Sequence, residues 1–233
     1  MRGLPPSALA PILPLDMPYL VGCRRALRHI LFLGLLVLPI YGCDTEETSS
    51  GAAMDAAPGP VRAMGSASAP VTIIDYSSLT CPHCAKFHIE TLPVLKANYI
   101  DTGKVRFLFR NFPLDGVAHK AAMLASCTSD DKYFQFLDVL FARQRKWAGS
   151  NDPRTELMNL GKMAGIDEKS FDACMKNSEL ADSILEERLY GEKTYEITST
   201  PTLIIQGKKH VGALAPEGID ALLGPILKEA EGS

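Results

Sequence analysis

Two cysteines separated by only two residues are the most chemically reactive feature of the sequence. Cys81 and Cys84 enclose Pro82 and His83, and they follow an apolar, β-branched segment at residues 71–76. This spacing brings two sulfur atoms within reach of a short disulfide. A pattern typical of a helix comes next, and the unpaired N–H groups at a helix start favour a thiolate on the first sulfur. We therefore expect a redox-active dithiol at a strand-to-helix turn.

The residue between the thiols that could tune them is His83. A helix dipole supplies only about 0.3–2 kcal/mol, which is under roughly 1.5 pKa units. A strongly lowered thiol pKa therefore also needs N–H···S hydrogen bonds and a cationic neighbour, and the His83 imidazole can be that cation. A stabilised thiolate favours the reduced dithiol, so the corresponding disulfide becomes a strong oxidant.

The tetrapeptide Cys81-Pro82-His83-Cys84 resembles the active site of the DsbA-like thiol:disulfide oxidases of the bacterial periplasm. Asp75 lies six residues before Cys81, close to where thioredoxin-like proteins carry a buried acid. Ser199-Thr200-Pro201-Thr202 resembles their cis-proline loop. The resemblance covers about residues 64 to 230 and implies a thioredoxin fold with an inserted helical subdomain.

The resemblance also implies roles for three residues outside the tetrapeptide. Asp75 would accept or pass the proton of Cys84, and a cis Pro201 would place the Thr200 backbone against the sulfurs. The alternatives are a solvent-facing Asp75 and a Pro201 that simply begins a strand. We interpret His88, His119 and His210 as ordinary structural or surface histidines.

Other uses of the Cys81/Cys84 pair are a structural disulfide or a metal site. His88 could supply a third ligand, but the sequence places no fourth ligand near it. The strand-to-helix context favours the redox interpretation.

Residues 1–43 are typical of a targeting segment. Arginines precede an apolar run at residues 30–40, which is shorter than the roughly 20 residues of a spanning helix and suits a signal peptide. The run ends in a sequence that resembles a bacterial lipoprotein cleavage box, so we expect acylation at Cys43. Asp44 resembles the signal that retains lipoproteins at the inner membrane. The alternative is ordinary secretion with an unmodified Cys43.

Translation starts at Met1 or at Met17, and either start places the mature chain in the periplasm. Four cysteines then remain besides Cys23 and Cys43. Because an even remainder in an oxidising compartment indicates two pairs, we expect Cys127 and Cys174 to form a structural disulfide. Two free buried thiols are the alternative.

The rest of the chain divides into parts of different pattern. Residues 44–69 lack apolar periodicity and predict a flexible tether, although 61–64 resemble a short edge strand. Residues 70–114 read as strand–helix–strand, 115–196 as helices, and 197–233 as a hairpin followed by a helix. About 80 mostly helical residues thus separate two strand-bearing halves, which indicates an α/β fold with a helical insertion in a βαβ–ββα frame.

Composition limits the other possible functions. The chain of 233 residues is 46% hydrophobic, enough for one core or a core plus a subdomain. A net charge of −3 without a basic patch of note gives no signal for nucleic acid. The lack of an evident dimerisation segment favours a monomer.

The leading hypothesis is a thiol:disulfide oxidase that acts on reduced secreted proteins and needs no bound cofactor or metal. The resemblance implies a DsbB-type membrane reoxidant as its partner. The rival interpretations are an extracytoplasmic reductase or isomerase, and a metal-carrying or scaffold protein that uses the same dithiol.

Overall fold

The computed structural model describes residues 56–231, and the structural statements below concern that range. The expected targeting segment, Cys43 and the first part of the tether lie outside the described residues. Within this range, no helix combines the length and the hydropathy that a membrane span requires.

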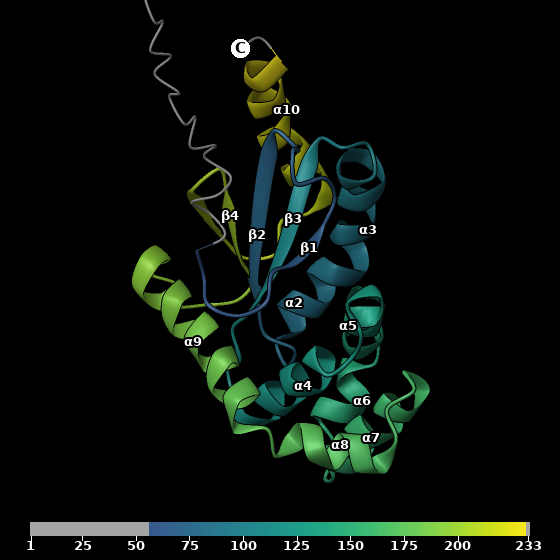
Figure 1. Ribbon diagram of the computed structural model, residues 1–233. Coiled ribbons are helices and arrows are strands. Elements are labelled where there is room, and N and C mark those ends of the chain that lie inside the picture. Colours follow the sequence, from purple (N-terminus) through teal and green to yellow (C-terminus); the bar gives the residue numbers. More distant parts are fainter. Residues whose placement is uncertain (1–55, 232–233) are drawn as a thin grey trace, which may run out of the picture. The chain divides into compact units, whose positions relative to one another are not determined.

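A five-stranded mixed sheet forms the centre of the fold (Figure 1). Its strand order is β1-β3-β2-β4-β5, with β2 and β3 parallel and the other neighbours antiparallel. The strands β2 and β3 are apolar along most of their length, as expected of central strands covered on both faces. Their bounds, with those of the outer strands, are β1 Arg62–Met64, β2 Val71–Ser77, β3 Val105–Asn111, β4 Thr202–Ile205 and β5 Lys208–Val211.

One long helical connection joins β2 to β3. It begins as α2 (Pro82–Lys86), continues as α3 (Leu92–Leu95), and includes π-helical turns at Phe87–Thr91 and Lys96–Ile100. Pro93 lies in the first turn of α3, where its missing N–H is tolerated because the preceding π-turn interrupts the regular ladder. Proline usually ends a helix, but at Pro93 only the helix type changes and the chain continues as a helix.

Six α-helices and a short 3-10 helix at Asp130–Lys132 form the insertion between β3 and β4, as the pattern of residues 115–196 predicts. Side-chain caps start four of them, each accepting an N–H bond at its helix start: Asp115, Asp152, Asp167 and Asn177. The helices are α4 Gly116–Ser126, α5 Tyr133–Ala142, α6 Gln144–Ala148, α7 Pro153–Met163, α8 Glu168–Met175 and α9 Ser178–Tyr195. Figure 1 shows α4 to α8 gathered at one end of the sheet.

The C-terminal part is a hairpin followed by helix α10 (Pro216–Glu231). The two turn residues are Gln206 and Gly207, with φ angles of 46° and 76°. The sequence pattern alone predicts this turn one residue later, at Gly207-Lys208. A two-residue hairpin turn that matches the strand twist needs positive φ at both central positions, so Lys208 instead begins β5.

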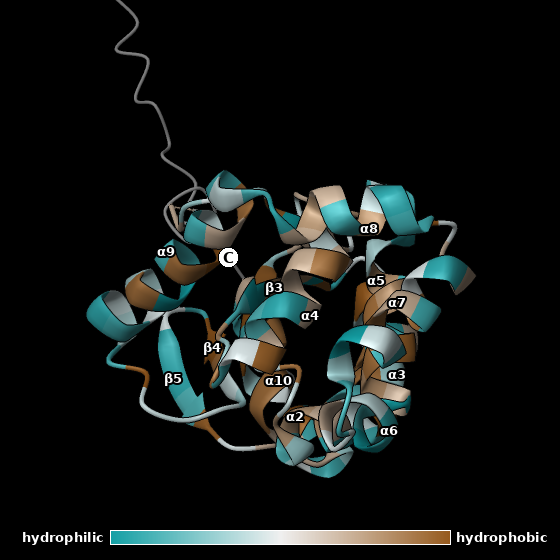
Figure 2. Cartoon of the chain, turned by 90° about the horizontal axis from the view of Figure 1, so that it is seen from below, coloured by the Kyte–Doolittle hydropathy of each residue, from teal (hydrophilic) through white to brown (hydrophobic). Residues whose placement is uncertain are grey.

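The core has a separate cluster on each face of the sheet. On one face, Ile73 and Phe107 pack with the β2–β3 connection, α5 and α10. On the other face, Ile74 and Leu108 pack with Tyr195 at the end of α9. Figure 2 shows the matching hydropathy, with hydrophobic stretches on α5 and α10 and a largely hydrophilic α6.

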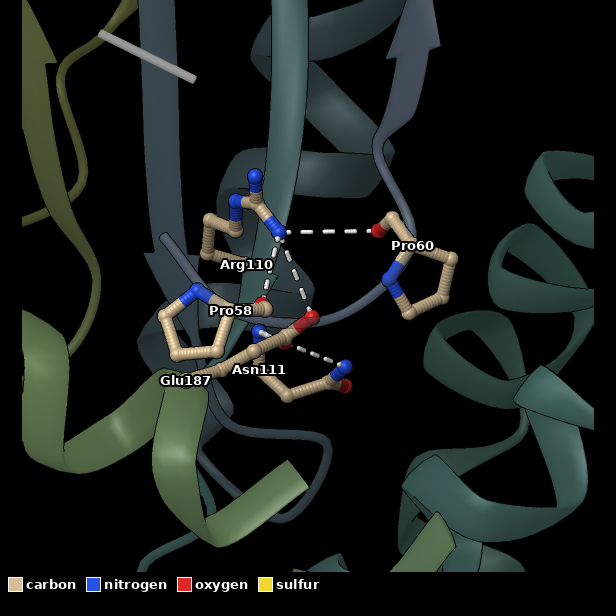
Figure 3. Close-up of polar contacts among 5 residues, drawn as sticks. All are labelled: Pro58, Pro60, Arg110, Asn111 and Glu187. Carbon is tan, nitrogen blue, oxygen red and sulfur yellow. Dashed lines mark hydrogen bonds and ion pairs between the residues drawn. The ribbon is translucent and has the colours of Figure 1, made fainter. Parts of the chain in front are cut away.

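The segment before β2 corrects the predicted tether. Residues 62–64 pair with β3, and the buried Arg110 donates from Nη1 to the carbonyl oxygens of Pro58 and Pro60 (Figure 3). The same Nη1 atom lies 3.4 Å from Oε1 of Glu187 on α9. The short edge strand expected at residues 61–64 is therefore present as β1, and the prediction of a flexible tether is wrong for residues 58–64. The physical reason is the buried Arg110 guanidinium. Leaving this charge without hydrogen-bond acceptors would be costly, so the carbonyl groups of Pro58 and Pro60 bind it.

Candidate active site

Cys81 occupies the cap position at the start of α2, where the sequence predicts it. Its N–H donates to Ser78 O at 3.1 Å, and its carbonyl accepts from Ala85 N at 3.1 Å. Pro82 takes the first helical turn, where a missing N–H costs nothing. Cys81 is 6% exposed and Cys84 is fully buried. The two thiols do not form a disulfide in this structure. Only the first sulfur is therefore open to an attacking partner.

The helical insertion holds the active-site turn at two points. Gln144 of α6 donates from Nε2 to Leu79 O at 2.8 Å and to Cys81 O at 2.9 Å. The Thr80 hydroxyl donates to Asp115 Oδ2 at 2.6 Å, while the other oxygen of Asp115 caps α4. Neither tie is visible in the sequence pattern, because the partners lie 35 residues or more away.

The surroundings of Cys81 lower the pKa of its thiol from 9.0 to about 5. The largest cause is a hydrogen bond from the Cys84 thiol, and the Thr200 hydroxyl and the backbone N–H groups of Cys84 and His83 add to it, against the opposing effect of burial. The backbone N–H groups at the start of α2 thus help to lower the Cys81 pKa, as the sequence predicts. The positive charge of the His83 imidazole is not among these leading causes, and the side chain is exposed.

The pKa of the Cys84 thiol shifts in the opposite direction. Burial raises the pKa of its thiol far above the ordinary value, and the bond to Cys81 and the charge of Asp75 raise it further. The Ser77 hydroxyl opposes these effects. At neutral pH the pair thus consists of a Cys81 thiolate and a Cys84 thiol, which gives the two sulfurs different chemical roles.

Asp75 is buried and has two partners. Its Oδ1 accepts from the Ser77 hydroxyl at 2.6 Å, and its Oδ2 lies 2.8 Å from Nε2 of His88. The alternative of a solvent-facing Asp75 is therefore wrong. The sequence interpretation also missed His88, which is 3% exposed and stacks on Phe141 with ring centroids 4.1 Å apart. The sequence feature that could have identified His88 is its position four residues after Cys84, one helical turn later on the same side of the helix.

Thr200 and Pro201 approach the same sulfur from the other half of the fold. Their peptide bond is cis, and the Cys81 Sγ lies 3.3 Å from the Thr200 carbonyl oxygen. The buried Thr200 hydroxyl bonds to no other group among the described residues, so it is free to donate to a thiolate. The sequence places these residues near the dithiol only through the family resemblance.

Among the described residues, the other cysteines form a disulfide, and His119 and His210 have other surroundings. Cys127 and Cys174 form a disulfide that joins the end of α4 to α8, as their even number predicts. His119 bonds to the backbone of Ala181 and His210 lies on β5. Within residues 56–231, no three His, Cys, Asp or Glu side chains are grouped to hold a metal ion.

Comparison with known proteins identifies the fold family. The family model described as Thioredoxin matches residues 58–224. The chain belongs to the thioredoxin family. Among solved structures, it is similar to alpha-DsbA1 of Wolbachia pipientis, with a TM-score of 0.70 and 29% identity over 78% of this chain and 98% of that chain. The predicted DsbA-like thioredoxin fold with a helical insertion is therefore confirmed.

Relatives in sequence point to one chemistry. A Rickettsia typhi protein that carries the name of a protein-disulfide oxidoreductase is 31% identical over 62% of this chain and 54% of its own length. A Bacillus anthracis protein named for disulfide bond formation is 28% identical over 72% of this chain and 77% of its own. Both names agree with the predicted class, a thiol:disulfide oxidoreductase. The chain spans about half the length of the Rickettsia relative, so the whole protein's reaction, substrates and partners are matters for proposal.

Proposed function

We propose that the protein is an oxidase that introduces disulfides into reduced proteins by exchange at Cys81 and Cys84. The observation that carries the proposal is the opposite perturbation of the two thiols, which lowers the pKa of Cys81 to about 5 and raises that of Cys84. A stabilised thiolate lowers the free energy of the reduced enzyme. The disulfide therefore accepts electrons readily.

The exchange then takes two displacements. A substrate thiolate attacks Sγ of Cys81, a bond forms between these sulfurs, and the Cys81–Cys84 bond breaks with its electron pair left on Cys84. A second substrate thiolate attacks the substrate sulfur of this mixed disulfide and releases the Cys81 thiolate. The substrate loses two electrons, and the enzyme dithiol gains them.

The proton for Cys84 is assigned to the buried polar group next to it. Because the Cys84 thiol has a raised pKa, its leaving sulfur takes up a proton. The Ser77 hydroxyl bonds to Asp75, and Asp75 contacts His88, so this chain of groups is positioned to pass the proton. Thr200 and Pro201 are assigned to the substrate backbone, and Pro82 and His83 shape the start of α2.

The cellular setting forms part of the proposal. The Cys127–Cys174 disulfide is typical of an oxidising compartment, which favours a location outside the cytoplasm, in the periplasm. A lipid anchor at Cys43 would hold the enzyme at the inner membrane, where a DsbB-type membrane partner would reoxidise the dithiol. The enzyme would act as a monomer on reduced secreted proteins, with residues 70–114 and 197–233 as the catalytic domain around the insertion.

The direction of exchange is tested by equilibrating the protein with glutathione. A potential near about −120 mV supports the oxidase, whereas one near about −270 mV contradicts it and favours a reductase. Initial rates on reduced and on scrambled ribonuclease then separate the oxidase from the isomerase, because only an isomerase acts well on the scrambled substrate. Thr200→Val removes a hydroxyl that lowers the Cys81 pKa and should shift the potential toward reducing values, with Thr200→Ser as the control.

A further inference from the structure

A groove runs beside the active-site helix, on the side that faces the insertion. It encloses about 720 Å³ between the β2–β3 connection and the segment from Phe141 to Lys146. Pro82 and His83, which directly follow Cys81, form part of its wall. Of the residues that line this groove, the proposed mechanism involves only Pro82 and His83.

Cations surround the groove. Lys86 comes from α2, and Arg143, Arg145 and Lys146 come from the start of α6, against the single acidic side chain of Glu90. All of these side chains are exposed. This local excess of positive charge stands out on a chain whose net charge is −3, and the sequence interpretation overlooked it because α2 and α6 lie far apart in the chain.

Much of this charge is available to a partner. Arg145 has no ion pair among the described residues, and the Arg143 guanidinium donates to the sulfur of Met163. Lys146 lies 3.5 Å from Glu156, but the Lys146 side chain is 69% exposed, so this attraction is small. Lys86 lies 3.9 Å from Glu90, but both side chains are more than half exposed, so their attraction is small. A negatively charged ligand would therefore meet cations that are not already neutralised.

The groove also offers an apolar contact. Ile89 is 52% exposed and lines the groove with the buried ring of Phe141. An exposed isoleucine next to a row of cations suits a polypeptide that carries both acidic and apolar side chains. A small inorganic anion would use the cations and leave Ile89 uncovered.

The groove has a fixed relation to the reactive sulfur. Gln144 lies in its wall and donates to the backbone of Leu79 and Cys81, at 2.8 and 2.9 Å. Figure 2 shows α2 and the largely hydrophilic α6 near each other at the same edge of the molecule. A polypeptide that occupies the groove would thus present a neighbouring cysteine to Cys81, since an extended chain advances about 3.3–3.6 Å per residue.

We propose that this groove docks an acidic segment that flanks the reactive cysteine of the exchanging polypeptide. The proposal rests on the proposed exchange function and adds a substrate class to it. Docking by charge raises the rate of encounter and selects among partners. The enzyme therefore exchanges faster with cysteines that have acidic neighbours than with cysteines that have basic ones.

The test uses three synthetic peptides with one cysteine each, flanked by Asp and Leu, by Lys and Leu, or by Ser and Leu. The oxidised protein reacts with each peptide, and the rate constant of mixed-disulfide formation is measured at low and high salt. Changes in the reactivity of the Cys81 disulfide multiply the acidic and basic rates equally. Each rate constant is expressed per peptide thiolate, because the flanking charges shift the pKa of the peptide cysteine, so the ratio then reports docking. We expect a ratio of about ten at low salt that falls toward one as salt screens the charges.

The groove variant Lys86→Glu/Arg145→Glu should invert the ratio and leave the rate of the Ser peptide within about twofold. Lys208→Glu/Lys228→Glu is the matched control, since it makes the same change in net charge on β5 and α10 and should keep the wild-type ratio. An unchanged ratio in the groove variant overturns the proposal, as does an equal loss in both variants. Failure of all three peptides to react would instead contradict the exchange function.

A membrane surface is the competing occupant of a cationic groove. Binding of the same proteins to vesicles of phosphatidylglycerol, with phosphatidylcholine vesicles as the neutral reference, separates the two. If the groove variant loses vesicle binding while its peptide ratio stays at the wild-type value, the groove contacts lipid and the proposal is wrong. An inverted peptide ratio with unchanged vesicle binding supports it.

Discussion

Nε2 of His88 lies 2.8 Å from Oδ2 of Asp75, and both side chains are buried in the core close to Cys84. The contact joins a residue on β2 to a residue one helical turn after the dithiol. Ser77 supplies the second hydrogen bond to the same carboxylate. The proton group assigned to Cys84 therefore consists of three residues, of which Asp75 alone was identified from the sequence.

Replacing His88 should destabilise the protein and slow exchange. His88→Leu leaves Oδ2 of Asp75 without its hydrogen-bond partner in an apolar environment, and leaving a buried polar group unpaired in this way costs about 1–3 kcal/mol. Unfolding of the oxidised protein by urea measures this free energy. His88→Asn keeps a donor and should recover much of it. A loss of under about 1 kcal/mol for His88→Leu would show that the contact contributes little.

The redox potential should depend on pH through the Cys81 thiolate. With a pKa lowered from 9.0 to about 5, the reduced enzyme is stabilised at pH 7 about a hundredfold, or about 60 mV for a two-electron couple. Because the pKa is lowered, this advantage is complete above pH 9 and disappears as the pH falls through about 5. Thiolate absorbance in the ultraviolet and glutathione equilibria across this range measure both quantities.

Cys84→Ala provides the control for that titration. It removes the thiol whose hydrogen bond is the largest cause of the lowered Cys81 pKa, so the pKa of Cys81 should rise. His83→Ala keeps the backbone N–H that contacts the sulfur and should shift the pKa less. If His83→Ala shifts it more than Cys84→Ala, the imidazole charge controls the thiolate, as the sequence interpretation assumed.

Removal of the second disulfide should lower stability without stopping exchange. Cys127 and Cys174 are 47 residues apart, and closing a loop of that length stabilises a protein by at most about 4 kcal/mol in the chain-entropy model. Cys127→Ala/Cys174→Ala should therefore lower the free energy of unfolding by up to this amount. Titration of thiols in the unfolded wild type before reduction gives the control, and four free thiols would contradict the pairing.

Glu187 should be needed to keep the segment before β1 in place. Its Oε2 accepts from the backbone N and the Nδ2 of Asn111, each at 2.8 Å, while Oε1 faces the buried Arg110. Glu187→Leu leaves the guanidinium without its counter-ion and should cost about 3–5 kcal/mol. Urea unfolding measures the loss, and limited proteolysis near Pro58 measures the release of the segment.

The double variant Arg110→Met/Glu187→Leu separates charge from packing. Removing both charges avoids an unpaired cation, so this variant should be more stable than Glu187→Leu alone. The segment near Pro58 should nevertheless become accessible to protease, because the donor to its carbonyl groups is gone. A double variant as unstable as the sum of the single variants would indicate that the pair does not interact.

Local sequence determined the parts of this protein that depend on near neighbours. The spacing of Cys81 and Cys84 fixes a dithiol at a helix start, and aspartates before helical patterns fix helix caps at Asp152 and Asp167. Alternation and 3.6-residue periodicity located most strands and helices. These features need only a few residues in sequence, so the sequence pattern is sufficient for them.

Tertiary structure decided every feature that joins distant segments. The pairing of His88 with Asp75, the bonds from Gln144 to the active-site turn, and the capture of Pro58 and Pro60 by Arg110 each follow from packing between elements. The cationic groove arises in the same way, from α2 and α6 brought side by side. A buried polar group takes whichever partner the fold places next to it, because leaving it unpaired costs more than any local preference.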